Sequence, residues 1–151
     1  MPPKLDQIDH RIIDALTANA RMPLTDLAKS VGLSKTPVAA RIKRLESEGI
    51  IKGYRAVLSA VGLGLTHVTY VEAKLTDTRE KALSAFNDAV RLIPEVEECY
   101  MISGGFDYLL KIRTQGMPEF RALMAERIST LPYLASTSSY VSMEAIVEVG
   151  F

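Results

Sequence analysis

The stretch LSKTPVAARIKRLESEG, residues 33–49, predicts an amphipathic helix in the first third of the chain. Ser34 suits the N-cap position of this helix, because its hydroxyl can accept a hydrogen bond from a free backbone N–H. At about 100° per residue, Val38, Ile42 and Leu45 fall on one face. The opposite face is small and basic, with Thr36, Ala40, Lys43, Arg44 and Ser47. One side of the helix is therefore expected to face a core and the other to face outward.

Two more helices are predicted upstream, over residues 5–21 and 22–32. Asp6 can cap the first, and Gly32 ends the second, since glycine readily adopts the left-handed conformation. Two short helices joined by the turn VGLS have the arrangement of a helix-turn-helix. Residues 50–58 (IIKGYRAVL) follow, and their alternation predicts a strand or wing packed on the three helices.

The charges divide unevenly, although the formal net charge of the chain is zero. Residues 1–63 carry ten Lys/Arg and six Asp/Glu, a net charge of +4, whereas residues 64–151 carry eight and twelve, a net charge of −4. A small, basic helix face fits a DNA major groove, where Lys and Arg reach phosphates or guanine edges. The front half is therefore predicted to bind double-stranded DNA. A basic helix face that is merely solvated is the plainer alternative.

Composition restricts the remaining chemistry. The single cysteine, Cys99, excludes an intrachain disulfide framework and fits a reducing compartment, so a cytoplasmic protein is expected. His10 and His67 lie far apart, so no metal site and no cofactor are predicted, and no Ser-His-Asp or Cys-His pairing suggests catalysis. No apolar run reaches the ~18 residues of a membrane span, and the N-terminus lacks the apolar stretch of a signal peptide.

The back half is predicted to contain four strands and two helices in the order strand, helix, strand, strand, helix, strand. The strands are expected at residues 67–75, 95–103, 106–114 and 133–149, and the helices at residues 78–93 and 117–130. Two β-α-β units in this order predict a ferredoxin-like α+β sandwich.

A spacing of 38 residues relates the two β-α-β units, as in Tyr70 and Tyr108 or Phe86 and Met124. This spacing indicates either a duplication or convergence, because two such units must place core residues alike. The strands carry apolar residues on both faces, while the helices cover only one face and no segment remains for the other. A second subunit is expected to cover the second face.

The loop SGGFDYLL, residues 103–110, admits two interpretations. In the first, backbone N–H groups around Gly104 and Gly105 bind the carboxylate of a small molecule, and Asp107 accepts from its ammonium group. In the second, the two glycines form a hairpin turn and Asp107 hydrogen-bonds nearby backbone. The residues alone favour neither interpretation.

The chain resembles the leucine-responsive/asparagine-activator (Lrp/AsnC, feast/famine) family of transcriptional regulators. The similarity covers residues 5 to 147 and rests on LDQIDHRIIDAL, LAKSVGLSKTPVAARIKRLESEGIIKGYRAVL, PEVEECYMISGGFDYLLKIRT and LPYLASTSSYV. It is specific, because the helix-turn-helix string and a G-x-x-D-Y string, Gly104 to Tyr108, both occur at the expected separation. The ending LASTSSYVSMEAI is most similar to members that activate proline catabolism.

This resemblance implies an α+β protein with an N-terminal winged helix-turn-helix and a ferredoxin-like βαββαβ (RAM/ACT-like) domain. The expected divisions are a DNA-binding domain over residues 1–53, a strand and linker over residues 54–65, and an effector-binding and oligomerisation domain over residues 66–151. An amino acid or related molecule is the implied effector, bound at the seam between dimers. The implied assembly is a homodimer that forms a tetramer or octamer.

The resemblance favours the binding interpretation of the loop and defines two sets of site residues. The predicted DNA-binding residues are Ser34, Lys35, Thr36, Ala40, Arg41, Lys43 and Arg44. The predicted effector-binding residues are Tyr100, Met101, Ser103, Gly104, Gly105, Asp107, Leu134, Ser136, Thr137 and Ser138, the three from residues 136–138 approaching from a neighbouring subunit. One departure from the family is that Ala40-Arg41 stands where many members have two consecutive arginines, which leaves one fewer positive charge.

Two other classes of protein remain as alternatives. An architectural DNA-binding protein would wrap DNA without responding to a ligand, so effector dependence of DNA binding separates it from a regulator. Sirohaem decarboxylases share this two-domain fold, so the fold alone does not exclude an enzyme. Catalysis on a porphyrin would require histidines or arginines converging on the ligand domain, and that domain holds His67 alone. A regulator that is not an enzyme is therefore expected.

Overall fold

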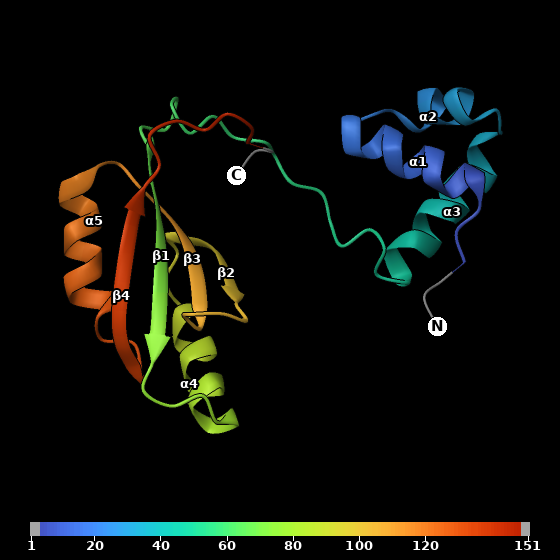
Figure 1. Cartoon of the computed structure of the whole chain (residues 1–151). Helices are drawn as coiled ribbons and strands as arrows, with labels where there is room; N and C mark the ends of the chain where they lie inside the picture. Colours follow the sequence, from blue (N-terminus) through green and yellow to red (C-terminus); the bar gives the residue numbers. More distant parts are fainter. Residues whose placement is uncertain (1–3, 149–151) are drawn as a thin grey trace. The chain divides into compact units, whose positions relative to one another are not determined.

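The computed structural model describes residues 4–148 of the chain and divides into two compact units (Figure 1). The boundary falls between Ala56 and Val57, inside the segment 54–65 that the sequence predicts as strand and linker. Residues 149–151 of the predicted C-terminal domain lie outside the described residues.

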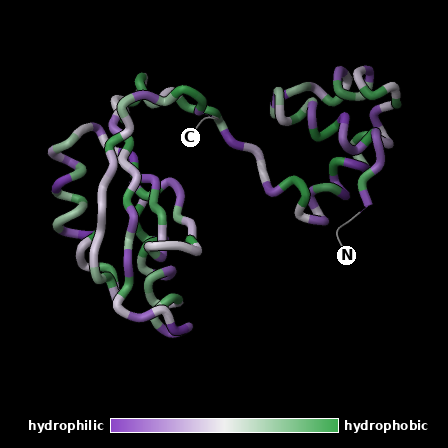
Figure 2. The backbone as a smooth tube through the Cα atoms, viewed as in Figure 1, coloured by the Kyte–Doolittle hydropathy of each residue, from purple (hydrophilic) through white to green (hydrophobic). Residues whose placement is uncertain are grey.

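The N-terminal unit contains three helices, α1 (Gln7–Ala18), α2 (Leu24–Val31) and α3 (Lys35–Ser47). Figure 2 shows hydrophobic and hydrophilic positions interspersed along them, as expected for amphipathic helices. Their hydrophobic sides form one core of buried residues: Ile12, Leu27, Ala28, Val31, Val38 and Leu45. The three helices predicted from the sequence are therefore present, and α3 buries the face that was expected to point inward.

The turn between α2 and α3 has the predicted glycine stop. Gly32 adopts a left-handed conformation with φ of 73°, and its N–H reaches the carbonyls of Ala28 and Lys29 at the end of α2. Ser34 occupies the N-cap position of α3, but its side chain makes no capping hydrogen bond. The position of this cap was thus predicted correctly, whereas its stabilising hydroxyl contact is absent from the described structure.

The predicted strand over residues 50–58 is not formed. Ile50 and Ile51 donate their backbone N–H groups to the carbonyl of Leu45, at 2.9 and 3.0 Å, and pack against the three-helix core. Residues 52–58 have neither helix nor strand. A strand requires a neighbouring strand for its hydrogen bonds, and the described part of this unit offers none.

The C-terminal unit has the predicted ferredoxin-like order of elements. Its strands are β1 (His67–Leu75), β2 (Val96–Met101), β3 (Tyr108–Thr114) and β4 (Leu134–Val141), and its helices are α4 (Glu80–Val90) and α5 (Met117–Leu123), which continues as the π-helical turn η1 (Met124–Ile128). The sheet has the order β2-β3-β1-β4, with every neighbouring pair antiparallel. Figure 1 shows these four strands with α4 and α5 beside them.

The last strand is shorter than predicted. β4 ends at Val141, and the N–H of Ser142 makes a further hydrogen bond to the carbonyl of Val68, near the beginning of β1. Residues 142–148 have no strand partner beyond this point, and residue 149 of the predicted strand lies outside the described residues. The start of β1 therefore sets the end of β4.

One face of the sheet packs on the helices. Val71 and Leu75 of β1, with Tyr108, Leu110 and Ile112 of β3, are buried in a single core. The helices contribute Phe86, Val90, Phe120, Leu123 and Ile128 to it. The rings of Phe86 and Tyr108 lie 4.4 Å apart between centroids, tilted by 31°, which is a favourable contact for aromatic side chains.

The opposite face of the sheet, here called the open face, is more polar than the sequence predicts. It exposes Tyr70, Tyr100 and Tyr140, but Lys111 lies opposite Tyr70 in the β1–β3 pairing. Within residues 4–148, Glu148 of the C-terminal segment contacts the side chain of Lys111 on this face, but Tyr70, Tyr100 and Tyr140 stay exposed, so this contact does not cover the face. The open face thus combines exposed aromatic rings with paired charges.

Candidate DNA interface and effector site

The outward face of α3 is exposed as predicted. Solvent reaches Ser34, Lys35, Thr36, Ala40, Lys43 and Ser47. Within residues 4–148, neither Lys35 nor Lys43 makes a hydrogen bond or ion pair. Small side chains allow a helix to approach DNA closely, and unpaired ammonium groups can bind phosphates. This arrangement has the properties that a DNA-binding helix needs.

Two arginines of α3 are engaged inside the N-terminal unit. Arg41 Nη1 lies 2.7 Å from Asp9 Oδ1 and 2.7 Å from Asp6 Oδ2, and Arg44 Nη2 lies 2.5 Å from Asp9 Oδ2. The Arg44 side chain was expected to point outward, but its length lets the guanidinium reach back to α1, where it stays 42% exposed. Both arginines therefore join α3 to the start of α1.

Asp9 is the centre of this cluster, with a side chain that is only 1% exposed. Burial alone would raise its pKa, but hydrogen bonds from the Asp6 backbone N–H, Arg41 and Arg44 outweigh burial and lower the pKa from 3.8 to about 2. Asp9 also completes a capping box, because Asp6 accepts from the Asp9 backbone N–H at 2.9 Å. Sequence analysis predicted the cap and missed the arginine contacts, whose partners lie 32 and 35 residues away.

The loop after β2 holds Asp107 against the central strand β1. Asp107 Oδ2 accepts from the backbone N–H of Leu75 at 2.7 Å, and the Asp107 N–H donates to the carbonyl of Ala73 at 3.0 Å. No hydrogen bond reaches Asp107 Oδ1 within the described residues. The predicted backbone contact is therefore present, although its partner is a neighbouring strand, and one carboxylate oxygen remains available.

The two glycines of this loop are not required by its backbone. The loop is closed by the Ile102 N–H, which donates to the carbonyl of Asp107 at 2.8 Å, so it is longer than a two-residue hairpin turn. Neither Gly104 nor Gly105 has the left-handed φ that favours glycine, and a Cβ placed on Gly105 would meet no atom within 4 Å. Fold geometry thus leaves room at Gly105 for another molecule to approach.

The sheet register brings the other predicted effector residues to the same end of the sheet. Ala73 of β1 lies opposite Tyr108 on one side and Thr137 on the other, and Met101 lies opposite Tyr108. Leu134 pairs with Leu75, Ser136 with Lys74 and Ser138 with Glu72. The start of β4 is therefore one strand away from the Asp107 loop within a single chain. Tyr100 is directed to the open face, where its hydroxyl donates to Glu98 at 2.8 Å.

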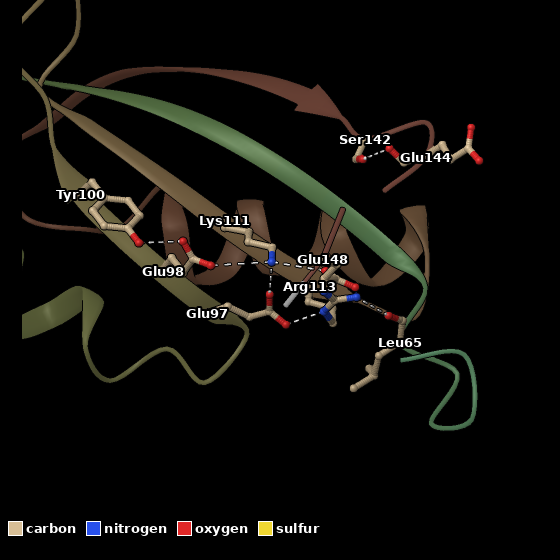
Figure 3. Close-up of polar contacts among 9 residues, drawn as sticks. All are labelled: Leu65, Glu97, Glu98, Tyr100, Lys111, Arg113, Ser142, Glu144 and Glu148. Carbon is tan, nitrogen blue, oxygen red and sulfur yellow. Dashed lines mark hydrogen bonds and ion pairs between the residues drawn. The ribbon is translucent and has the colours of Figure 1, made fainter. Parts of the chain in front are cut away.

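A second ionic cluster lies on the open face (Figure 3). Arg113, whose side chain is 4% exposed, contacts Glu97, Glu148 and the carbonyl of Leu65. Lys111 lies 3.1 Å from Glu97 Oε2 and 3.4 Å from Glu148 Oε1. Sequence analysis missed this cluster, because Glu148 approaches from 35 residues away. It anchors the C-terminal segment to β3.

Two other kinds of feature are missing from the described part of the chain. Residues 4–148 contain no group of three or more His, Cys, Asp or Glu side chains that could hold a metal ion. No helix among them combines the length and the apolar character that crossing a membrane demands.

Comparison with known proteins defines the class to which this fold and these sites belong. The family model for the Lrp/AsnC ligand binding domain matches residues 68–150, and that for a winged helix-turn-helix DNA-binding domain matches residues 5–52. The chain belongs to the Lrp/AsnC family of transcriptional regulators. It is accordingly a DNA-binding regulator with an amino-acid-binding domain, and not an enzyme.

Particular relatives are similar over nearly the whole chain. The proline dehydrogenase transcriptional activator of Rhodobacter capsulatus is 64% identical over 144 residues, which are 95% of this chain and 94% of the relative. The protein of the same name from Rhizobium radiobacter is 52% identical over 146 residues, 97% and 94% of the two chains. A crystal structure of a transcriptional regulator of Neisseria meningitidis in complex with L-Met superposes with a TM-score of 0.90 at 28% identity, covering 96% of this chain and 94% of the other. These matches agree with the predicted proline subgroup.

Proposed function

We propose that this protein activates transcription of a proline dehydrogenase gene and that α3 enters the major groove of its operator. The observation that carries the DNA contact is the row of exposed small and basic residues on α3, in which Lys35 and Lys43 have no partner within residues 4–148. Lys35 and Lys43 bind phosphates, whereas Thr36 and Ala40 face base edges. Arg41 and Arg44 hold the helix in place through Asp9 and contribute positive charge beside the groove.

We propose that the effector is an amino acid, with L-proline or a close relative as the first candidate, because two similar proteins are named for proline dehydrogenase. The ammonium or imino group of the effector binds the free Oδ1 of Asp107, and its carboxylate binds backbone N–H groups around Gly104 and Gly105. The L-Met complex of the neisserial regulator supports an amino acid as the class of ligand. Met101 and Leu134 supply apolar contacts.

The effector site is proposed to be completed by a second subunit. The loop that holds Asp107 is open at Gly105, and the open face exposes Tyr70 and Tyr140 on adjacent strands. We propose that two open faces pack together in a homodimer, and that dimers meet at the Asp107 end of the sheet in a tetramer or octamer. Ser136, Thr137 and Ser138 of a neighbour then approach the effector. Because its partner is chromosomal DNA, the proposed location is the cytoplasm.

Fluorescence anisotropy of a labelled promoter fragment, from upstream of a proline dehydrogenase gene, tests this function. The regulator should bind the fragment, and a saturating amount of L-proline should change the apparent affinity at least several-fold. A panel of the other nineteen amino acids identifies the effector if proline is inactive. Binding that no amino acid alters would instead support the architectural alternative, in which the protein organises DNA without sensing a ligand.

A further inference from the structure

The chain that follows α3 is held against the last turn of this helix at two points. At the first, the backbone N–H groups of Ile50 and Ile51 donate to a carbonyl of that turn at 2.9 and 3.0 Å. At the second, the Tyr54 hydroxyl donates to Glu46 Oε1 at 3.0 Å. All these residues belong to one compact unit. Residues 52–55 therefore have a defined place beside the C-terminal end of α3.

The second attachment point decides on which side of α3 this segment lies. Glu46 follows Lys43 by three residues, so the two side chains are neighbours on the helix surface. Lys43 belongs to the exposed outward face of α3. Gly53 has a φ of 155°, which residues with side chains rarely adopt, and it lets the chain bend back between its two attachment points. The segment thus returns along the flank of α3 that carries Lys43.

The segment presents positive charge that no part of the unit uses. Lys52 and Arg55 are exposed, and within residues 4–148 neither side chain makes a hydrogen bond or an ion pair. The two acids closest to them in the sequence already have partners. Glu46 accepts the hydrogen bond described above, and Glu48 Oε1 lies 4.0 Å from Arg44 Nε. Two cations are therefore available beside the outward face of α3, while the neighbouring carboxylates are engaged.

The width of the DNA major groove indicates what these cations would meet. The groove is about 12 Å wide, and an α-helix with its side chains has a diameter of about 10–12 Å. A helix that enters the groove fills it, so a segment on the flank of that helix faces the sugar-phosphate backbone at the border of the groove. Lysine and arginine side chains bind phosphates through charge-assisted hydrogen bonds.

We propose that residues 52–55 form a second DNA contact, in which Lys52 and Arg55 bind phosphates at the border of the groove that α3 occupies. This inference rests on the proposed function of α3 and extends the DNA-binding surface beyond that helix. Tyr54 is a positioning residue, because its hydrogen bond to Glu46 keeps the segment on the helix. Phosphates are the same at every base pair, so this contact adds affinity without reading the sequence.

The salt dependence of DNA binding by the full-length protein tests this contact. Affinity is measured by fluorescence anisotropy for two short duplexes, one from the promoter fragment and one of unrelated sequence. In Lys52→Ala and in Arg55→Ala, the slope of log affinity against log salt should become shallower by about 0.9 on both duplexes, with roughly five- to tenfold weaker binding at 0.1 M salt. The matched controls are Lys81→Ala on α4 and Arg121→Ala on α5, which remove exposed cations of the C-terminal unit and should keep the slope of the parent.

Tyr54→Phe tests how the segment is positioned. This change keeps the ring and removes the hydroxyl that donates to Glu46, so the segment should loosen and DNA binding should weaken about threefold on both duplexes. The Tyr54 side chain is half exposed and lies outside the helical core, so the melting temperature should stay near that of the parent. A loss of DNA affinity without a loss of stability separates a positioning role from a purely structural one.

The outcomes separate this proposal from the placement of α3. A shallower slope in Lys43→Ala beside parent-like slopes in Lys52→Ala and Arg55→Ala would overturn the second contact and leave α3 in the groove. Parent-like slopes in all three variants would overturn both. A loss confined to the promoter duplex would overturn the assignment to phosphates, since it would mean that the segment reads base edges. Equal affinity of the parent for both duplexes would overturn only the proposed target gene, because the slopes are also measured on unrelated DNA.

Discussion

Two aspartates, one in each unit, show how the same carboxylate serves different purposes. Asp9 is 1% exposed, and both of its oxygens accept from arginines of α3. Asp107 is partly buried, and within residues 4–148 only its Oδ2 accepts a hydrogen bond, from the Leu75 N–H. Asp9 is buried and already accepts three hydrogen bonds, so no ligand can reach its oxygens, whereas Asp107 is oriented by one oxygen and its other oxygen is still able to accept. The difference distinguishes a residue that holds the N-terminal unit together from one that we propose recognises an effector.

The largest expected effect belongs to Asp107→Ala. Loss of a charge-assisted hydrogen bond to the effector nitrogen should weaken effector binding by ~2–5 kcal/mol, or roughly 30- to several-thousand-fold. DNA affinity without effector should stay at the parent level, because the N-terminal unit is untouched. Isothermal titration with the effector and anisotropy with promoter DNA measure the two quantities.

Asp107→Asn separates the two roles of this side chain. The amide oxygen can still accept from Leu75, so the melting temperature should remain near that of the parent while the effector response is lost. If instead the response survives in both variants and only stability falls, by about 1 kcal/mol, Asp107 is a structural residue of the loop.

The second effect is the loss of stability in Asp9→Ala. This change removes the common partner of Arg41 and Arg44 and one part of the capping box, so the free energy of unfolding should fall by about 2–3 kcal/mol. The value lies below that of a fully buried pair because both arginines retain contact with water. Urea unfolding followed by circular dichroism measures it. Asp14 is an exposed acid on the same helix, and Asp14→Ala is the control. Equal stability of the two variants would contradict the structural role assigned to Asp9.

The third effect is the pH dependence of the stability that Asp9 contributes. The pKa of Asp9 is about 2 in the folded protein and 3.8 is its ordinary value, so the stabilisation is complete above pH ~4 and is lost as the pH falls toward 2. The stability difference between the parent and Asp9→Asn should therefore shrink by roughly 2 kcal/mol between pH 6 and pH 2. Asp14→Asn is measured beside it as the control variant. A constant difference across this range would mean that Asp9 does not carry its charge into the folded state.

The smallest effect is expected at the open face, for Glu148→Gln. Arg113 and Lys111 hold this carboxylate and lower its pKa, but the side chain is 29% exposed and Arg113 keeps Glu97 as a partner. The cost should be about 1 kcal/mol or less in urea unfolding. A loss as large as that of Asp9→Ala would show that the C-terminal segment, and not only the helical core, is essential to the fold of this unit.

Elements with local signals were predictable from the sequence. The cap at Asp6 and the left-handed Gly32 are defined by short-range chemistry, so the start of α1 and the end of α2 followed from them. The order of strands and helices followed from periodicity, and the antiparallel β2-β3-β1-β4 sheet follows from that order. The loop around Asp107 was located in the same way, although its hydrogen bond to Leu75 could not be known.

Features that depend on distant partners were not predictable. The arginine contacts of Asp9 span more than thirty residues, and nothing in the spacing marks them. The 38-residue spacing paired Tyr70 with Tyr108, but Tyr70 is 39% exposed on the open face while Tyr108 is buried against the helices. Strand faces are set by register, which a sequence interval does not determine. The strand expected at residues 50–58 does not form for a related reason, because a strand needs a neighbouring strand for its hydrogen bonds.

The salt dependence of DNA binding by Lys43→Ala tests most directly whether the outward face of α3 contacts DNA. Affinity for the promoter fragment is measured for the parent and the variant across a range of salt concentrations, with Lys81→Ala on α4 as the control. If Lys43 binds a phosphate, the slope of log affinity against log salt should become shallower by about 0.9 in Lys43→Ala and remain unchanged in Lys81→Ala. A Lys43→Ala variant with the affinity and slope of the parent would contradict the assignment of this helix face to DNA.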